Sequence, residues 1–315
     1  MTPPPTSSIP ASRSTWGLYQ KAFLEDLRAR NLSPRTVETY RDAIRQLGQF
    51  LEREHLPADP QAVRPEQIRA FITDLLARHS ASTANNRYRA LNAFFNWLVE
   101  QEYLAASPMA KLKPPRVEEK VVPVIPPSDM DRLFKHLSGK DFESRRDRAI
   151  FSVLVDTGMR LSECAEIRFA ADDAVNDVDT EYGQIRVFGK GGRERIVSLG
   201  RKARGDLNHY LLARARHPHA GEPYLWLGRR GRMTNNGIYQ MARKRGAEAG
   251  ISNLNPHRFR HTFAHEWLAH DGNEGDLMRL TGWHSRTMLQ RYGASAGSRR
   301  ALDAHKRNSP RDRVG

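Results

Sequence analysis

Apolar residues recur along the first part of the chain with the spacing of amphipathic helices. The first stripe consists of Trp16, Tyr19, Phe23 and Leu27. One face of a helix repeats every three or four residues, so this stripe predicts a helix over about residues 14–30. Ser33 and Pro34 then provide an N-cap and a first helical residue, and the apolar stripe after them predicts a second helix over about 34–54.

Two further stripes extend this helical pattern. Pro65 opens a third predicted helix, and Thr83 is a candidate cap for a fourth. Together the four helices predict a compact N-terminal domain over residues 14–107. Residues 1–13 are rich in Pro, Ser and Thr and cannot bury apolar surface, so we expect a flexible leader there.

A proline-rich stretch over residues 108–127 interrupts the pattern. It contains six prolines and several basic side chains, a composition that resists helix formation and favours an extended connector between domains. A basic linker of this kind would be able to follow a DNA duplex, but a plain spacer explains it equally well.

The part of the chain after this linker is predicted to be mainly helical, with one β-hairpin. Ser128 is a candidate cap for a helix over residues 129–138, and an apolar helix follows over about 145–155. Alternating apolar residues predict a strand over Gln184–Phe188, and the glycine-rich segment after it predicts a turn into a second strand over 193–198.

Length and composition fit two domains. A chain of 315 residues with 39% apolar residues can build two ordinary cores. We therefore expect a mainly α protein with a small β-hairpin or sheet. In this interpretation a helical N-terminal domain precedes an α+β domain over residues 128–300, and a basic tail follows over 301–315.

The chain is strongly basic, with 51 Lys plus Arg against 36 Asp plus Glu and a formal charge of +15. Such a charge attracts a polyanion, and nucleic acid is the leading partner, although a charge that serves only solubility is the simpler alternative. No apolar run approaches the roughly 18 residues of a membrane span. The start lacks the features of a secretory signal, and the single Cys164 has no disulfide partner, so we expect a cytoplasmic protein.

Arg160 is the first candidate for chemistry. It comes just after the break at Gly158 and stands at the predicted start of a helix, a position that directs a guanidinium into a cleft. Arginine presents a planar fork of donors that matches two phosphate oxygens, and it stays charged at any working pH. Glu163, one turn later, would hold this guanidinium in place. A plain surface ion pair between the two residues is the alternative if the motif stands alone.

A second candidate segment runs from His257 to His261. On a helix, His257, Arg260 and His261 share one face, whereas Arg258 points away from it, so Arg260 is the expected phosphate ligand. Two histidines four residues apart also suggest zinc. However, Arg258 stands where a zinc protease has Glu, and the neighbouring cations oppose a divalent metal, so we expect no metal.

Tyr292 is the candidate nucleophile, and Trp283 and His284 precede it. A tyrosine hydroxyl has a pKa near 10, so it needs a strongly positive phosphate site or a nearby base to lose its proton. A buried core tyrosine is the usual alternative for one such residue. That alternative is weaker here, because glycine-flanked Lys190 and the arginine and histidine candidates belong to the same predicted domain.

These motifs, taken in order, resemble the tyrosine recombinase (phage integrase) family in its simple two-domain form. The residues that carry the resemblance are Arg160, Lys190, His257, Arg260, Gly282 with Trp283, and Tyr292. The resemblance covers essentially residues 14–300 and implies a helical core-binding (SAM-like) domain, a linker and a catalytic domain. Trp283 stands where the family more often has histidine. We assign it to the catalytic set and keep His284 as the alternative.

This resemblance implies a site-specific recombinase that cleaves and rejoins duplex DNA through a 3′-phosphotyrosine at Tyr292, for integration, excision or dimer resolution. Arg160 and Arg260 would stabilise the charge of the phosphate, Lys190 would protonate the departing 5′ oxygen, and His257 would act as general base. The expected supporting residues are Glu163, His261 and His284. No cofactor is implied.

The implied partners are double-stranded DNA and further copies of the chain, as a dimer on each site and a tetramer in synapsis, at the nucleoid and not in a membrane. The basic residues expected to contact DNA are Arg35, Arg87, Arg89, Arg232, Arg243 and Lys244. Solvated helix faces are the common alternative for such residues. A type IB topoisomerase and a non-catalytic DNA-binding regulator remain as alternative functions, although a regulator should lack a complete catalytic set.

Overall fold

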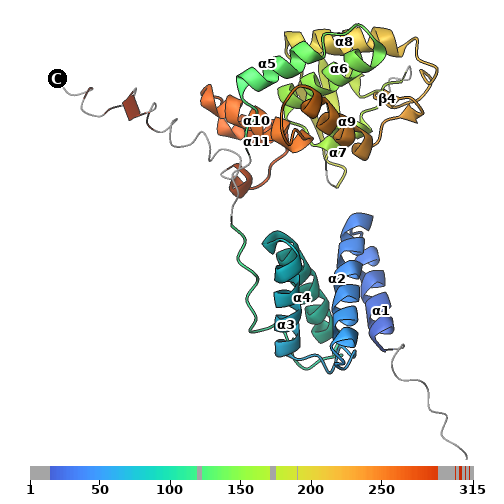
Figure 1. The fold of residues 1–315 in the computed structure, drawn as a ribbon, viewed down its shortest axis with the longest axis vertical. Coiled ribbons are helices and arrows are strands. Elements are labelled where there is room, and N and C mark those ends of the chain that lie inside the picture. Colours follow the sequence, from blue (N-terminus) through green and yellow to red (C-terminus); the bar gives the residue numbers. More distant parts are fainter. Residues whose placement is uncertain are drawn as a thin grey trace, which may run out of the picture. The chain divides into compact units, whose positions relative to one another are not determined.

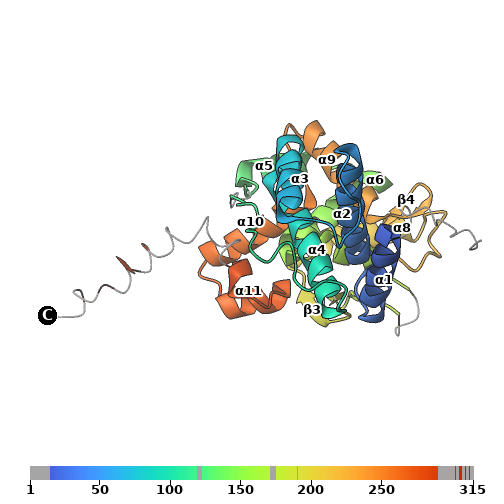
Figure 2. The same ribbon diagram turned by 90° about the horizontal axis from the view of Figure 1, so that it is seen from below.

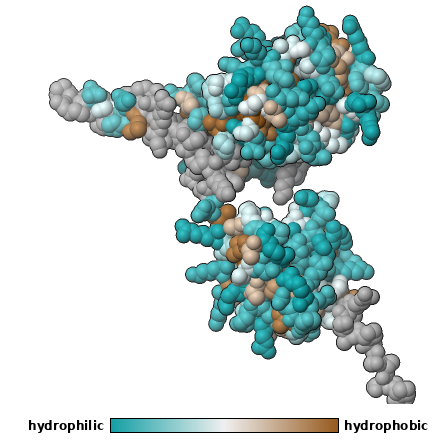
Figure 3. Space-filling model, in the orientation of Figure 1, coloured by the Kyte–Doolittle hydropathy of each residue, from teal (hydrophilic) through white to brown (hydrophobic). Residues whose placement is uncertain are grey.

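The structure is a computed structural model that describes residues 15–118, 123–170, 175–189 and 191–289, with five isolated positions farther along. The predicted leader, Lys190, Tyr292 and most of the predicted tail lie outside the described residues. The chain divides into two compact units, unit 1 (Met1–Glu119) and unit 2 (Lys120–Gly315). Each unit has its own apolar core. Hydrophilic side chains cover most of the face seen in Figure 3, where apolar residues form only small patches.

Unit 1 is a helical bundle (Figures 1 and 2). Over residues 15–118 its helices are α1 (Thr15–Ala29), α2 (Pro34–Arg53), α3 (Pro65–Arg78) and α4 (Ala81–Glu100). The apolar stripes predicted from the sequence meet in its core, where the rings of Phe23, Phe94 and Trp97 pack against one another. None of the described helices is long and apolar enough to cross a membrane.

The helix starts of unit 1 follow local side-chain chemistry. Ser33 caps α2 as predicted, because its hydroxyl accepts the backbone N–H of Thr36. The prediction for α4 was wrong by three residues. Its cap is Ser80, whose hydroxyl accepts the backbone N–H of Thr83 at 3.2 Å, so Thr83 already belongs to the first turn.

The start of the proline-rich stretch packs on unit 1. Residues 108–111 form turns, and the side chain of Met109 is buried in the core of the bundle. Tyr88 and Asn85 of α4 donate hydrogen bonds to the carbonyls of Leu112 and Pro115. These contacts hold residues 109–115 against unit 1, although proline prevents a continuous helix there.

Unit 2 combines helices with small antiparallel sheets. Its described helices are α5 (Pro127–His136), α6 (Phe142–Thr157), α7 (Leu161–Glu166), α8 (Arg201–Arg214), α9 (Asn235–Glu248), α10 (Pro256–Ala269) and α11 (Glu274–Thr281). Its described strands are β1 (Val178–Asp179), β2 (Gln184–Phe188), β3 (Glu194–Ser198), β4 (Leu227–Gly228) and β5 (Gly231–Arg232). Helix α6 packs against α8 and α10, and α10 lies beside α11 (Figures 1 and 2).

The predicted hairpin is present as β2 and β3, and β1 extends it to a sheet in the order β1-β2-β3. Helix α5, by contrast, does not use Ser128 as its cap. Pro126 takes the cap position and Pro127 is the first helical residue, which suits the fixed φ of proline. Helix α6 begins at Phe142, three residues before the predicted start, because Asp141 accepts the backbone N–H of Ser144.

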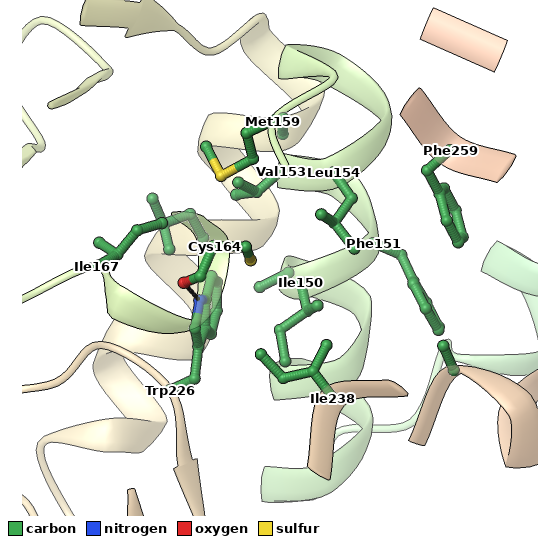
Figure 4. Close-up of a cluster of buried hydrophobic side chains, with 14 of the residues drawn as sticks. Ile150, Phe151, Val153, Leu154, Met159, Cys164, Ile167, Trp226, Ile238 and Phe259 are labelled. Atoms are coloured by element: carbon green, nitrogen blue, oxygen red, sulfur yellow. Dashed lines mark hydrogen bonds between the residues drawn. The ribbon is translucent and has the colours of Figure 1, made fainter. Parts of the chain in front are cut away.

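The core of unit 2 surrounds α6 and α7 (Figure 4). The indole N–H of Trp226 donates to the carbonyl of Cys164 at 2.9 Å, and the apolar residues Ile150 and Leu154 of α6 lie in the same buried cluster. Burial raises the pKa of the Cys164 thiol to about 12. This packing fixes the end of α6, where the candidate site begins.

Candidate active site

Arg160 is positioned by the tight turn between α6 and α7. Gly158 has a φ of +58°, and a Cβ at this position would lie 2.3 Å from the ring of Phe263, so the turn requires glycine. Arg160 follows as the N-cap of α7. The turn thus places its guanidinium at a cleft of about 1230 Å³.

Glu163 holds Arg160 at one end. The Glu163 carboxylate is only 3% exposed, and it accepts both the backbone N–H of Arg160 and the guanidinium Nη1, each at 2.8 Å. The Arg160 side chain is 39% exposed. Among the described residues, nothing accepts a hydrogen bond from its remaining donors. This guanidinium is therefore anchored on one side and open to the cleft on the other.

Arg195 of β3 binds the same carboxylate, although it belongs to none of the motifs found in the sequence. Its Nη1 and Nη2 donate to the two oxygens of Glu163 at 3.1 and 2.6 Å. Burial alone would raise the pKa of Glu163, but the hydrogen bonds from Arg195 and Arg160, together with the charge of Arg195, outweigh it and lower that pKa. The available signal was strand alternation, since position 195 faces inward with Val197, where a cation needs a buried partner.

Helix α10 carries Arg260, whose contacts brace the turn before Arg160. Arg260 is 3% exposed and donates to the carbonyls of Gly158 at 2.6 Å and Thr281 at 2.8 Å. Its neighbour Arg258 instead donates to carbonyls at Ser252, Pro123 and Val124. The two arginines thus serve different sides of the helix, as its period predicts.

The two predicted site histidines of α10, His257 and His261, differ in exposure. His261 is buried, whereas His257 lies at the surface, with part of its ring desolvated. This desolvation and the positive charge of Arg260 lower the pKa of His257. The lowered pKa favours the neutral imidazole, whose lone pair can accept a proton. No group of three or more His, Cys, Asp or Glu side chains suited to a metal occurs among the described residues.

Trp283 follows a second left-handed glycine, Gly282, at the end of α11. The indole is buried in a small cluster with Leu268, Leu277 and Leu289, and one side of it lines the cleft. His284 is exposed, and its Nε2 lies 2.9 Å from Nη1 of Arg193.

The cleft brings together residues from three parts of unit 2. Its lining includes Arg160 from the start of α7, Gly189, Gly191 and Arg193 from the hairpin turn, and Trp283 and His284 after α11. Lys190 and Tyr292 are outside the described residues, although the glycines on both sides of Lys190 line the cleft. The described arginines outnumber the carboxylates around this cleft, which suits an anionic ligand.

The predicted DNA-contacting residues differ in their availability. Arg35 and Arg89 of unit 1 and Arg243 and Lys244 of α9 are exposed. Arg87, in contrast, bridges α4 to Gln46 and the Thr39 carbonyl of α2. Arg232 pairs with Glu166 and stacks on Tyr224. These two guanidiniums already make contacts within their own units.

Comparison with known proteins agrees with this architecture. Residues 123–299 match the model of the phage integrase family, and residues 19–104 match that of the phage integrase N-terminal SAM-like domain. The tyrosine recombinase XerC of Staphylococcus aureus (strain bovine RF122 / ET3-1) is 30% identical over 276 residues, which cover 87% of this chain and 90% of that protein.

Solved structures show the same fold. The crystal structure of XerA recombinase is 25% identical with a TM-score of 0.51, over 93% of this chain and 99% of that one. XerH bound to a palindromic difH substrate is 18% identical with a TM-score of 0.71, over 90% of this chain and 84% of that one. The predicted fold class, mainly helical with a SAM-like N-terminal domain and a catalytic domain, is confirmed.

The fold and the family matches define an enzyme of DNA strand exchange. The chain belongs to the phage integrase family, the tyrosine recombinases. It is a tyrosine-type site-specific recombinase, as the sequence predicted, and the topoisomerase and regulator alternatives are not favoured.

Proposed function

We propose that the cleft beside Arg160 binds the scissile phosphate of duplex DNA and that Tyr292 attacks this phosphate. The observation that carries the proposal is the one-sided anchoring of Arg160, because the donors left open at the cleft can bind two phosphate oxygens. Trp283 and the hairpin turn line the same cleft. In this proposal the domains over 14–107 and 128–300 grip the duplex, and residues 108–127 connect them.

The proposed reaction keeps the energy of the broken phosphodiester bond in a new bond between tyrosine and phosphate. The phenol oxygen of Tyr292 bonds to phosphorus while the bond from phosphorus to the 5′ oxygen breaks, which leaves a 3′-phosphotyrosine and a 5′-hydroxyl. His257 takes the phenol proton, and Lys190 donates a proton to the departing 5′ oxygen. Arg160 and Arg260 stabilise the charge that develops on the phosphate. Attack by a 5′-hydroxyl from a partner duplex reverses the step and exchanges strands.

The neutral state of His257 supports its proposed role. A general base must be unprotonated at the working pH, and the lowered pKa of this imidazole favours that form. Trp283 contributes its buried ring to the wall of the site, and Glu163 orients Arg160. His261 within α10 and His284 beside Arg193 of the hairpin turn take supporting roles.

The proposed partners follow from charge and from relatives. A formal charge of +15 and exposed Arg35, Arg89, Arg243 and Lys244 favour contact with DNA phosphates. Lambda integrase has been crystallised as a dimer bound to a core site and as a tetramer bound to a Holliday junction. We extend that assembly to this chain, with a dimer on each site and a tetramer in synapsis, acting at the nucleoid in the cytoplasm.

One experiment tests the nucleophile. The wild-type protein selects its preferred sequence from a random duplex library, and a labelled duplex of that sequence then serves as the probe. We expect the wild type to form a covalent adduct that survives denaturation, whereas Y292F binds the duplex without forming one. Y182F, which alters an exposed tyrosine in a turn, serves as the matched control and should form the adduct. An adduct with Y292F would contradict the proposal.

A plasmid with two copies of the selected sequence distinguishes recombination from relaxation alone. Joined products with exchanged flanks support the recombinase. Relaxation of supercoils without any exchange would instead favour a topoisomerase.

A further inference from the structure

Arg195 lies where three elements that carry proposed site residues meet. It belongs to β3, the strand that follows the hairpin turn containing Lys190 in the sequence. Its guanidinium binds Glu163 at the start of α7, and its Nε donates to the carbonyl of Leu280 near the end of α11 at 2.8 Å. The Arg195 side chain is only 12% exposed.

The Glu163 carboxylate is fully used by two arginines. Oxygen Oε1 accepts from Nη1 of both Arg160 and Arg195, and Oε2 accepts from the Arg160 backbone and from Nη2 of Arg195. A carboxylate offers about four acceptor sites, so none is left for another donor. Arg195 occupies two of these sites, and this limits the Arg160 side chain to a single bond.

Removing Arg195 would free two of the acceptor sites of Glu163. Glu163 would remain buried with one cation, and a buried carboxylate strongly favours a two-bond fork with a guanidinium. Arg160 is the only other arginine hydrogen-bonded to Glu163 among the described residues, so it would turn its second terminal nitrogen toward that carboxylate. Its donors would then leave the cleft.

We propose that Arg195 is a positioning residue for DNA cleavage, which neutralises Glu163 so that Arg160 keeps its free donors directed at the scissile phosphate. This inference rests on the proposed function of Arg160. Lysine cannot replace Arg195, because only the planar fork reaches both oxygens of Glu163 and the Leu280 carbonyl together.

The packing of Arg195 leaves little freedom for a different geometry. A Cβ added at Gly282 would approach Nη1 of Arg195 to 3.3 Å, so the guanidinium lies directly beneath the turn that leads to Trp283. The same side chain thus joins the support of Arg160 to the segment that carries Trp283.

The test measures the rate of adduct formation at saturating concentrations of the selected duplex, with the duplex affinity measured separately. Removal of a residue that orients a metal ligand typically lowers activity by about 10- to 100-fold. We take the same range for a residue that orients a reactive arginine. We expect a loss of this size for R195Q, with little change in affinity. R195K retains the charge without the fork and should fall between the wild type and R195Q. A wild-type rate for R195Q would overturn the proposal.

The double variant E163Q/R195Q gives a readout that a merely structural role would not produce. Without the negative charge at position 163, nothing pulls Arg160 out of the cleft, so the double variant should cleave faster than R195Q alone. This is non-additivity of the kind expected for residues in direct contact. A double variant slower than R195Q would overturn the proposal, and R195K provides the comparison if R195Q does not fold.

R186Q is the matched control for losing an arginine from the same sheet. Arg186 of β2 pairs with buried Asp177 at 3.2 Å, and it is not among the residues that line the cleft. We expect R186Q to lower the stability of unit 2 while the adduct forms at the wild-type rate. A loss of rate in R186Q equal to that in R195Q would show that any weakening of the sheet is enough.

A duplex with sulfur in place of the 5′-bridging oxygen separates this inference from the proposed function. A thiolate leaves without a proton, so this duplex should rescue K190A, whose defect is the missing general acid. R195Q should stay slow on it, because its defect is at Arg160. Rescue of R195Q would overturn the inference. Failure to rescue K190A, or an adduct with Y292F, would count against the proposed function instead.

Discussion

The guanidinium carbon of Arg260 lies 5.2 Å from the centre of the Trp283 ring, so a buried cation is covered by an aromatic face. Desolvated pairs of this kind contribute about 2 kcal/mol or more. Arg260 also donates to Gly158 and Thr281, so the turn before Arg160 and the end of α11 are tied to α10. Trp283 therefore acts on the geometry of the site and also lines its wall.

Trp283 and His284 should separate in their effects on stability. W283A removes a ring buried with Leu268 and Leu277, which typically costs about 3–5 kcal/mol. H284A alters an exposed side chain and should change stability little. Chemical denaturation gives the free energies of unfolding, and adduct formation gives the activities. If H284A lost more stability and more adduct formation than W283A, the catalytic position would be assigned to His284.

Arg258 and Arg260 form a natural pair for comparison on one helix. R260Q should slow adduct formation by about 100-fold or more, because in the proposed function it removes preorganised positive charge that stabilises the phosphate. R258M should instead destabilise the fold by about 1–3 kcal/mol, since it removes the buried guanidinium that donates to the carbonyls of Pro123 and Val124. The R258M protein that remains folded should cleave like the wild type. If R258M showed the cleavage defect instead, the assignment of the helix faces would be reversed.

The pKa of His257 should respond to Arg260. NMR titration of the wild type is expected to give a pKa below the ordinary value of 6.5, because desolvation and the Arg260 charge both disfavour the imidazolium. R260Q removes only the second effect, so the pKa should rise part of the way back. Adduct formation by the wild type should fall as the pH drops through the lower pKa. An unchanged pKa in R260Q would show that the two groups do not interact.

Glu163 should make stability depend on pH in the acid range. Its pKa is lowered in the folded state from the ordinary 4.5, so its ionised form stabilises the fold above that value. This stabilisation should disappear as the pH falls through the folded-state pKa, where the side chain becomes protonated. The difference in free energy of unfolding between the wild type and E163Q should therefore shrink in acid. A constant difference across the titration would contradict this.

The arginines of unit 1 should divide into two groups. R35A and R89A remove exposed charges and should each lower the salt dependence of DNA binding by about one unit of slope if the side chain contacts a phosphate. R87A should lower the stability of the bundle, because Arg87 links α4 to Gln46 of α2. Binding measured across salt concentrations, together with thermal unfolding, checks both. Equal salt slopes for the wild type and R35A would exclude Arg35 from the interface.

Local patterns in the sequence were sufficient for most of the fold. The period of apolar residues located the four helices of unit 1, and the Ser33-Pro34 pair located the start of α2 because capping depends on neighbouring residues. Helices α8 and α11 of unit 2 were not predicted. The cap of α4 was harder to place, since Ser80 and Thr83 are both good capping residues within one turn. Only the structure shows which of the two hydroxyls accepts an unpaired backbone N–H at the start of the helix.

The network around Glu163 shows what local patterns cannot reveal. The helix start predicted its contact with Arg160, three residues away. Arg195 is 32 residues from Glu163 and 85 from Leu280 in the sequence, so its role depends on how the hairpin packs against α7 and α11. The alternation of β3 marked position 195 as inward-facing, but it could not name the partner.

The burial of Cys164 has a practical consequence for spectroscopy. Thiol reagents react with the thiolate. Cys164 is protected because its pKa of about 12 keeps the thiol protonated and because its burial keeps reagents away. The native protein should therefore resist alkylation, and the rate of modification would report how often this core opens. Because the chain has one cysteine, a new one placed on the surface would accept a fluorophore selectively, without replacement of the native thiol.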